Sequence, residues 1–309
     1  MNATAPPRLV LVDGSASLYR AFFALPPLAT AQGLPTHAVL GFTTMLLKLL
    51  REEAPQAAAV VFDGPGRTRR HDEFPEYKAQ RPAMPDRLLS QLPYLHRILA
   101  ALRMPVLTHP GEEADDLLGA LALRAAADGY QVVLVTGDKD LLQLVGERIV
   151  LREPLKSGVT GAAEVEARYG LPPASLPELF ALTGDSIDNI PGVPGVGEKT
   201  ARDLLRQFGS VEALLARLEE VPRPKLREVL AMHTDRIRLN RQLVMLRTDL
   251  PVGCTLEDLA LREPDRPAML ALCEELEFSR LAQQFRDPAA KPSSPSPGRP
   301  DSGGQPSLL

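Results

Sequence analysis

The sequence predicts an α/β layer fold in the first half of the chain and a helical unit in the second half. Short apolar runs that favour strands alternate with longer helical patterns up to about residue 170. From about Leu171 onward the strand signals nearly vanish, and Pro and Gly turns separate helical segments. An acidic residue also follows each predicted strand. Together these features are typical of a mostly parallel sheet, flanked by helices, that binds a ligand at one edge.

The elements of the first half follow from the spacing of apolar residues. Buried strands of a mostly parallel sheet are expected at residues 8–12, 57–62, 105–108 and 131–136. Helices are expected between them, at residues 39–51, 86–102 and 114–127. Strands that alternate with helices in this way are joined by right-handed crossovers.

Composition excludes several other classes of protein. A chain of 309 residues with 44% hydrophobic and 24% charged residues is soluble and globular. Cys254 and Cys273, its only cysteines, lie outside any Cys-x-x-Cys spacing, which argues against a zinc site or a disulfide framework. Without a signal peptide or an apolar run of roughly 20 residues, we expect a cytoplasmic protein with no membrane contact. Residues 286–309 are rich in Pro, Ser and Gly and are expected to be a disordered tail.

Carboxylates follow every predicted strand. Parallel strands present their carboxyl ends at one edge of a sheet, so the acids after the four strands should meet there. A further pair, Asp185 and Asp188, follows the first helix of the helical half, and its spacing of three residues allows both to share one face. The set comprises Asp13, Asp63, Glu113, Asp115, Asp116, Asp138, Asp140, Asp185 and Asp188.

Nine converging acids need protons or cations, because two carboxylates about 4 Å apart repel by roughly 4 kcal/mol at an effective dielectric constant of about 20. Oxygen-only ligand sets suit Mg²⁺ or Mn²⁺. The sequence therefore predicts a two-metal hydrolytic centre, although any single Asp could equally be a turn residue or an N-cap. Without these nine acids the formal net charge changes from −4 to about +5, which is compatible with a nucleic-acid partner.

Two further segments suggest contacts with nucleic acid. Residues 192–200 nearly match a phosphate-binding Walker A loop, but Glu198 separates Gly197 from Lys199 and a helix precedes the loop, which argues against an NTPase. A Gly-rich turn that opens a helix instead offers backbone N–H groups to a phosphate, although a plain turn between helices stays an alternative. The basic residues with a nearby aromatic at 66–82 suggest contact with a single strand, although a solvated charged loop is also possible.

The motifs that carry a family resemblance occur in order at residues 12–23, 61–63, 77–82, 113–116, 136–140 and 184–200. Over residues 8–281 the sequence resembles the 5′–3′ exonuclease domain of bacterial DNA polymerase I, within the flap endonuclease superfamily. The resemblance implies a PIN-like α/β nuclease domain over residues 1–172, with an arch at about 64–90, and a SAM-like all-α domain over 173–285 with a helix–three-turn–helix, of the helix-hairpin-helix type. With no polymerase domain after Leu281, a free-standing exonuclease is expected.

The resemblance also implies roles for the candidate residues. The catalytic metal would be held or oriented by Asp13, Asp63, Glu113, Asp115 and Asp116, and the second metal by Asp138, Asp140, Asp185 and Asp188. The catalytic step would rest on Asp63, Asp116, Lys78 and Arg81, the last two stabilising phosphate charge. The arch would be lined by Arg20, Tyr77, Lys78 and Arg81. The downstream duplex would be gripped, with a bound K⁺, by Gly192, Val193, Gly195, Val196, Gly197, Lys199 and Thr200. Departures from the family pattern occur at Leu40, Arg69 and Glu112.

The implied activity is that of a metal-dependent 5′–3′ exonuclease and 5′-flap endonuclease in DNA replication and repair, including the removal of RNA primers from Okazaki fragments. It would use two Mg²⁺ ions, which Mn²⁺ can replace, on DNA with a free 5′ end or flap. A monomer is expected, working alongside a DNA polymerase and a ligase. Two alternatives stay open: a catalytically silent, structure-specific DNA-binding protein, which the full set of acids disfavours, and a PIN-type ribonuclease, which the helical domain disfavours.

Overall fold

The main sheet is parallel, and its strand order reverses at its centre. The computed structural model describes residues 6–154 and 158–286. Its main sheet has the order β3-β2-β1-β4-β5, with every pair parallel. The strands are β1 (Arg8–Asp13), β2 (Ala57–Val61), β3 (Val106–Leu107), β4 (Gln131–Val135) and β5 (Ile149–Arg152). The four predicted strands are confirmed, whereas β5 was not predicted. The direction of strand addition reverses between β1 and β4, where open α/β sheets form their ligand site.

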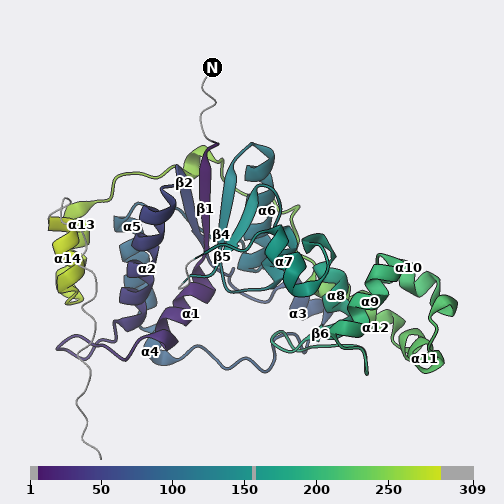
Figure 1. The fold of residues 1–309 in the computed structure, drawn as a ribbon. Helices are drawn as coiled ribbons and strands as arrows, with labels where there is room; N and C mark the ends of the chain where they lie inside the picture. The colour runs from purple at the N-terminus through teal and green to yellow at the C-terminus, as the bar shows by residue number, and fades with distance from the viewer. Residues whose placement is uncertain (1–5, 155–157, 287–309) are drawn as a thin grey trace, which may run out of the picture.

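Helices cover both faces of this sheet (Figure 1). In β1, Leu9 and Leu11 belong to one core cluster and Val10 and Val12 to another, so alternate residues face opposite layers. The layer on the Val10 face contains α1 (Gly14–Ala24), α2 (His37–Glu53) and α5 (Leu92–Ala101), and the opposite layer contains α6 (Ala114–Ala127). Strands buried on both faces have to be continuously apolar, which explains why sequence patterns detected them.

The predicted helices are confirmed at residues 39–51 and 114–127, but residues 86–102 form two helices. The first is α4 (Asp86–Leu89), and α5 begins at Leu92 with a proline in its first turn. Pro93 has no N–H to donate inside a helix, so it is compatible with the start of a helix and not with its interior.

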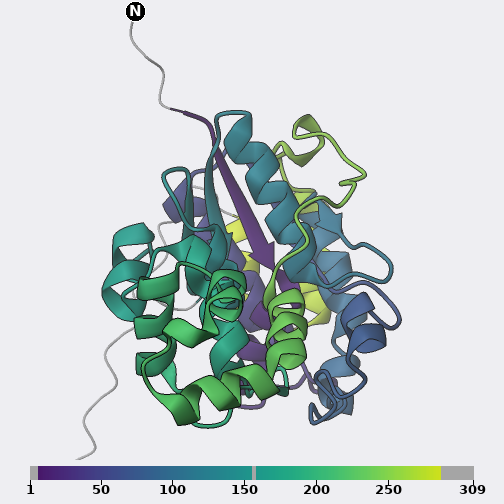
Figure 2. The ribbon, with the colours of Figure 1, turned by 90° about the vertical axis from the view of Figure 1, so that its right-hand side faces the viewer.

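The helical region extends to one side of the sheet (Figures 1 and 2). Helix α7 (Ala162–Tyr169) precedes this region, whose α-helices are α8 (Leu176–Thr183), α9 (Glu198–Phe208), α10 (Val211–Ala216), α11 (Pro224–Met232) and α12 (Thr234–Val244). An antiparallel hairpin of β6 (Gly184–Asp185) and β7 (Ile190–Pro191) interrupts it. Asp185 and Asp188 therefore lie on a hairpin, and the expected shared helical face is wrong. Short elements elsewhere are α3 (Arg69–Glu73) and the 3-10 helices at Asp140–Leu144, Pro173–Ser175, Leu218–Glu220 and Glu257–Leu259.

The last two helices return to the α/β layers. After α12 the chain runs back along β2, where Ala260 bridges to Ala57, and forms α13 (Arg266–Glu275) and α14 (Ser279–Arg286). Figure 1 shows both helices beside α2 and α5, and their apolar residues share the core cluster of those helices. The predicted helical unit over 173–285 thus needs correction, because its final part packs on the first domain. The predicted tail at 286–309 begins one residue too early, because Arg286 is the last residue of α14; residues 287–309 lie outside the described residues.

Across the described residues, no helix has both the length and the apolar character that crossing a membrane requires.

Candidate metal centre and DNA-binding surface

Asp13 is fixed where β1 ends beside β4. Its side chain is 3% exposed. Its Oδ1 accepts a hydrogen bond from Ala16 N at 2.9 Å, which caps α1, and its Oδ2 accepts one from Thr136 Oγ1 at 2.8 Å. Because the turn into α1 and the end of β4 both hold this carboxylate, its position is set by the switch point of the sheet.

Asp63 contacts the first turn of α6, which carries Asp115. Asp63 follows β2, and its Oδ1 accepts a hydrogen bond from Ala114 N at 3.0 Å. That bond brings the first turn of α6, with Asp115, next to the end of β2. Burial, together with the charges of Asp138 and Asp13, raises the pKa of Asp115 well above its usual range. Asp115 therefore lies close enough to Asp138 and Asp13 for their carboxylates to repel one another.

A second group of acids joins the end of β4 to the hairpin. Carboxylate oxygens of Asp140, Asp185 and Asp188 lie within 4.8 Å of one another. Asp138 connects this trio to Asp13: its Oδ1 accepts a hydrogen bond from Asp140 N at 2.9 Å, and its charge contributes to the raised pKa values of both Asp13 and Asp140. These contacts join Asp13, Asp138, Asp140, Asp185 and Asp188 into one cluster, whereas the convergence of all nine acids stays a prediction.

The electrostatics of this cluster favour a bound cation. Burial is the largest cause that raises the pKa of Asp13 to about 6, and Asp63 and Asp138 raise it further. The pKa values of Asp138 and Asp140 are raised by burial and then by neighbouring carboxylates. All these donors are oxygens, so the residues fit hard divalent ions such as Mg²⁺ or Mn²⁺.

Besides Arg70, which lies 3.0 Å from Glu113 Oε2, three basic side chains already contact these acids. Lys78 Nζ lies 2.8 Å from Glu113 Oε1 and 3.8 Å from Asp188 Oδ2. Arg81 Nη2 lies 2.8 Å from Asp188 Oδ1, and Lys139 Nζ lies 2.9 Å from Asp185 Oδ2. Burial lowers the pKa of Lys78, but Glu113 and Asp188 outweigh it and raise the pKa overall, so the ammonium stays charged. Sequence reasoning missed Lys139, although it lies inside the motif at 136–140.

The prediction that Tyr77 lines the arch and contacts the 5′ strand of the DNA needs correction. Its ring is buried, at 2% exposure, and its hydroxyl lies 2.9 Å from Glu113 Oε2 and 2.8 Å from Asp188 Oδ2. A ring packed in the core offers no face to a nucleobase, so Tyr77 here serves to link the two carboxylates.

Asp116 also has a different environment from the one predicted. It is fully buried and forms a two-pronged ion pair with Arg70, with Nη2 at 2.8 Å from Oδ1, while Oδ1 also accepts a hydrogen bond from Arg247 N at 2.8 Å. Arg70 Nε donates to Leu243 O at 2.7 Å. With its two carboxylate oxygens engaged by Arg70 and by the backbone N–H of Arg247, Asp116 joins α3, α6 and the end of α12.

The Gly-rich loop between β7 and α9 has two positions, Gly192 and Gly195, at which only glycine fits. A Cβ at Gly192 would lie 2.1 Å from Thr183 O, and Gly195 has a φ of +78°. Val193 and Val196 are buried, so their side chains hold the loop in place and only their backbone could meet DNA. Gly197 caps α9 with open space around it, Lys199 is exposed and Thr200 is half-buried.

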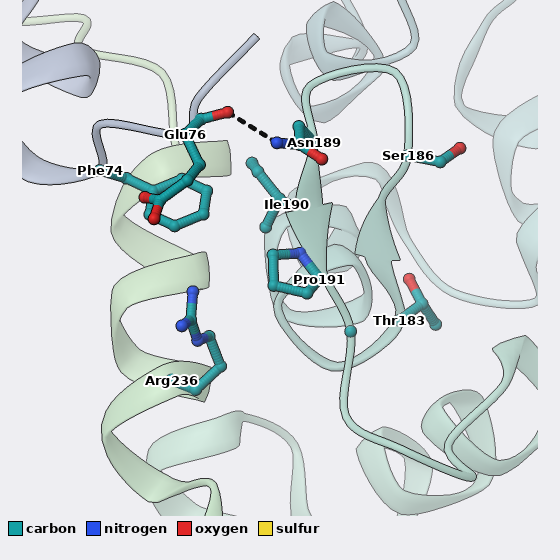
Figure 3. Close-up of a pocket in the computed structure, with 9 residues that line it drawn as sticks. Phe74, Glu76, Thr183, Ser186, Asn189, Ile190, Pro191 and Arg236 are labelled. Atoms are coloured by element: carbon teal, nitrogen blue, oxygen red, sulfur yellow. Dashed lines mark hydrogen bonds between the residues drawn. The ribbon is translucent and has the colours of Figure 1, made fainter. Parts of the chain in front are cut away.

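A cavity of about 550 Å³ separates α12 from the hairpin (Figure 3). In Figure 3, Arg236 points from α12 towards Phe74, with its guanidinium carbon 5.3 Å from the ring centroid, and Pro191 faces it. The dashed hydrogen bond from Asn189 Nδ2 to Glu76 O is 2.7 Å long. The segment after α3 is thus tied to the hairpin that carries Asp185 and Asp188.

The remaining predicted residues lie around the cluster. Arg20 Nη1 is 3.3 Å from Glu153 Oε2. Of the departures from the family pattern, Glu112 forms an ion pair with Arg247, Arg69 forms one with Glu73, and Leu40 is half-buried against the core. The pair between Glu112 and Arg247 gives a charged residue at position 112 a partner near the end of α12.

Comparison with known families matches nearly the whole described chain. Residues 8–170 match the family described as "5'-3' exonuclease, N-terminal resolvase-like domain" and residues 171–267 match "5'-3' exonuclease, C-terminal SAM fold".

Curated relatives include the 5'-3' exonuclease of Aquifex aeolicus (strain VF5), 40% identical over 280 residues that cover 89% of this chain and 94% of the relative. DNA polymerase I of Bacillus caldotenax is 43% identical over 293 residues, covering 93% of this chain but only 33% of the relative. The chain therefore spans about a third of the polymerase that it matches.

Solved structures with the same fold include T5 5'-exonuclease with bound zinc, at a TM-score of 0.67, 20% identity, and coverage of 90% of this chain and 98% of that one. The catalytic core of Rad2 in complex with a DNA substrate has a TM-score of 0.62 and 18% identity, and covers 88% of this chain and 89% of that one. At these identities the likeness concerns the fold. From the two family matches and the Aquifex relative, the chain belongs to the 5′–3′ exonuclease family, with a PIN-like, resolvase-like nuclease domain followed by a SAM-like domain.

Proposed function

We propose that this 5′–3′ nuclease hydrolyses phosphodiesters in DNA that carries a free 5′ end or a 5′ flap, with two Mg²⁺ ions that Mn²⁺ can replace. The observation that carries the proposal is the continuous cluster of acids at the carboxyl ends of β1, β2 and β4, with raised pKa values and an oxygen trio within 4.8 Å. Bound divalent ions supply Lewis-acid polarisation of the phosphate and a water of lowered pKa.

The two parts of the cluster support an assignment of two metal positions. Asp13, Asp63, Glu113 and Asp115 would hold or orient the ion at the scissile phosphate. The second ion would be held by Asp138, Asp140, Asp185 and Asp188. Asp116 would act through Arg70, by fixing the start of α6 that carries Asp115.

The basic residues suggest how the substrate is held. Lys78 and Arg81 lie at the carboxylates, where a cation can stabilise charge that grows on the phosphate during hydrolysis. Arg20 would contact the entering 5′ strand. The loop at 192–197, with a K⁺ ion, would bind duplex phosphates through backbone N–H groups.

The biological setting is also part of the proposal. We expect the protein to act as a cytoplasmic monomer in DNA replication and repair, on strands that a DNA polymerase and a ligase also process. Relatives named DNA polymerase I support this setting, since this chain matches a third of their length. Removal of RNA primers and of flaps would both need cleavage near a 5′ end.

The test is cleavage of a labelled 5′-flap duplex beside a single-stranded RNA, with and without Mg²⁺. We expect metal-dependent cleavage of the flap. Asp185→Asn should abolish it, whereas Asp128→Asn, at the far end of α6, should not. Metal-dependent cleavage of the RNA alone would favour a ribonuclease, and binding of the flap without cleavage would favour a silent binding protein.

A further inference from the structure

Lys139 joins the two halves of the proposed second metal position. It lies between Asp138 and Asp140, in the segment that follows β4. Its Nζ lies 2.9 Å from Asp185 Oδ2 on the hairpin and 4.8 Å from the ring centroid of Phe180 in α8. One ammonium therefore holds the hairpin, with its carboxylates, against the segment of the sheet that carries the other two acids.

This ammonium lies beside the carboxylates that a divalent ion would also use. Asp140, Asp185 and Asp188 bring carboxylate oxygens within 4.8 Å of one another. Carboxylates at this spacing repel one another, and Lys139 supplies a positive charge beside them in the metal-free protein. A divalent ion bound by the same three residues would repel the neighbouring ammonium, because both are cations. The second ion and Lys139 therefore compete for Asp185.

Lys139 is the member of this pair that can move. The side chain of Asp185 is 4% exposed, and its Oδ1 accepts a hydrogen bond from Ile187 N at 2.9 Å, which fixes it within the hairpin. The side chain of Lys139 is 29% exposed and lines a cavity of about 540 Å³ whose wall also includes Glu153 and Glu164. A lysine has a flexible stem and a strongly hydrated ammonium, so it can leave Asp185 for this cavity without a change in the backbone.

We propose that Lys139 is a positioning residue that takes the place of the second divalent ion in the metal-free protein, and that this ion displaces it from Asp185 on binding. The inference rests on the proposed function, because it concerns the second of the two metal positions. A contact made only in the metal-free protein stabilises that state, and it lowers the affinity for the ion by the corresponding factor. Lys139 thus keeps the carboxylates of the sheet and of the hairpin together and sets the metal concentration at which the second position fills.

The test compares metal binding and metal-free stability in the protein without DNA. Lys139→Met nearly keeps the length of the side chain and removes its charge. In calorimetric titration with Mn²⁺, the weaker of the two sites should bind about fivefold more tightly than in the native protein, the factor that corresponds to an ion pair of about 1 kcal/mol. The Tm measured without divalent ions should fall. Lys139→Arg should keep both native values. Loss of a residue that only supported the fold would not tighten metal binding.

Two comparisons assign the effect to Asp185. Lys48→Met is the matched control, because Lys48 pairs at 3.7 Å with Glu52 on the surface of α2, and it should change neither value. In an Asp185→Asn background, Lys139→Met should cause no further fall in Tm, since its partner is already neutral.

Unchanged or weaker binding of Mn²⁺ by Lys139→Met would overturn the inference, as would an equal fall in Tm in both backgrounds. Lys139→Gln gives the same comparison if the Met variant does not fold. Binding of a single Mn²⁺ ion by the native protein would instead overturn the two-metal function.

Discussion

The buried pair of Arg70 and Asp116 gives the sharpest test of how this site is built. Arg70→Met removes a guanidinium that is 4% exposed and leaves a fully buried Asp116 carboxylate without its main partner. It also removes the donor to Leu243 O, at the end of α12. We expect the change to destabilise the fold as a whole, because the pair joins α3 and α6 to α12.

The expected magnitude follows from the burial of both partners. Removal of one member of a buried ion pair typically costs about 3–5 kcal/mol, since the remaining charge is uncompensated. Replacement of both members by apolar groups, in Arg70→Met with Asp116→Leu, should cost less than Arg70→Met alone. An exposed pair is worth at most about 1 kcal/mol. Arg67→Met is therefore the control, because Arg67 and Asp72 are 66% and 71% exposed in their side chains.

Urea unfolding followed by circular dichroism measures these free energies. The double variant distinguishes a structural pair from a metal ligand, because a structural pair predicts partial recovery of stability. A loss below about 1 kcal/mol in Arg70→Met would refute the reasoning, as would a double variant that is less stable than either single variant.

Three further results are expected. Asp63→Ala should abolish cleavage but leave the DNA affinity, measured by gel shift, within about twofold of that of the native protein. Cleavage at a near-native rate would show that Asp63 is not a metal ligand. Lys78→Ala should lower the plateau rate of single-turnover cleavage. Gly197→Asp should raise only the enzyme concentration at half-saturation, compared with Gly197→Asn, because Asp and Asn are equally good N-caps and differ in charge. The reverse pattern would contradict this division of roles. Because the pKa of Asp13 is raised from 3.8 to about 6, the metal-free fold should gain up to about 3 kcal/mol in urea unfolding as pH falls from above 6 towards 4. Asp13→Asn should reduce that gain, and an equal gain in the variant would contradict the assignment.

The strands of the core were predictable because burial on both faces makes them continuously apolar. The missed strand β5 lies at the edge of the sheet, and its four residues alternate between buried and half-buried positions. So short a run carries too few residues for a periodicity to stand out. The hairpin of β6 and β7 was missed for the same reason, since each strand has two residues.

The candidate site divides in a similar way. The positions of the acids followed from local features, namely the ends of strands and the start of α6. The inward position of Tyr77 depends instead on Asp188, 111 residues away, and the pairing of Arg70 depends on Asp116, 46 residues away. Such contacts are set by tertiary packing. A segment with basic residues and an aromatic residue has the same sequence pattern whether its side chains face a substrate or the core.

The cations of the site explain how so many carboxylates can converge before any metal binds. Lys78, Arg81 and Lys139 contact oxygens of Glu113, Asp188 and Asp185, all of which we assign to metal positions. With Asp116 paired to Arg70, eight acids face three cations, a formal charge of about −5 that two divalent ions would reduce to about −1. Divalent ions that take over these oxygens would release basic side chains beside the phosphate that is to be cut. Lys78, Arg81 and Lys139, which balance the carboxylate charge in the metal-free fold, are therefore the side chains best placed to contact the substrate phosphate.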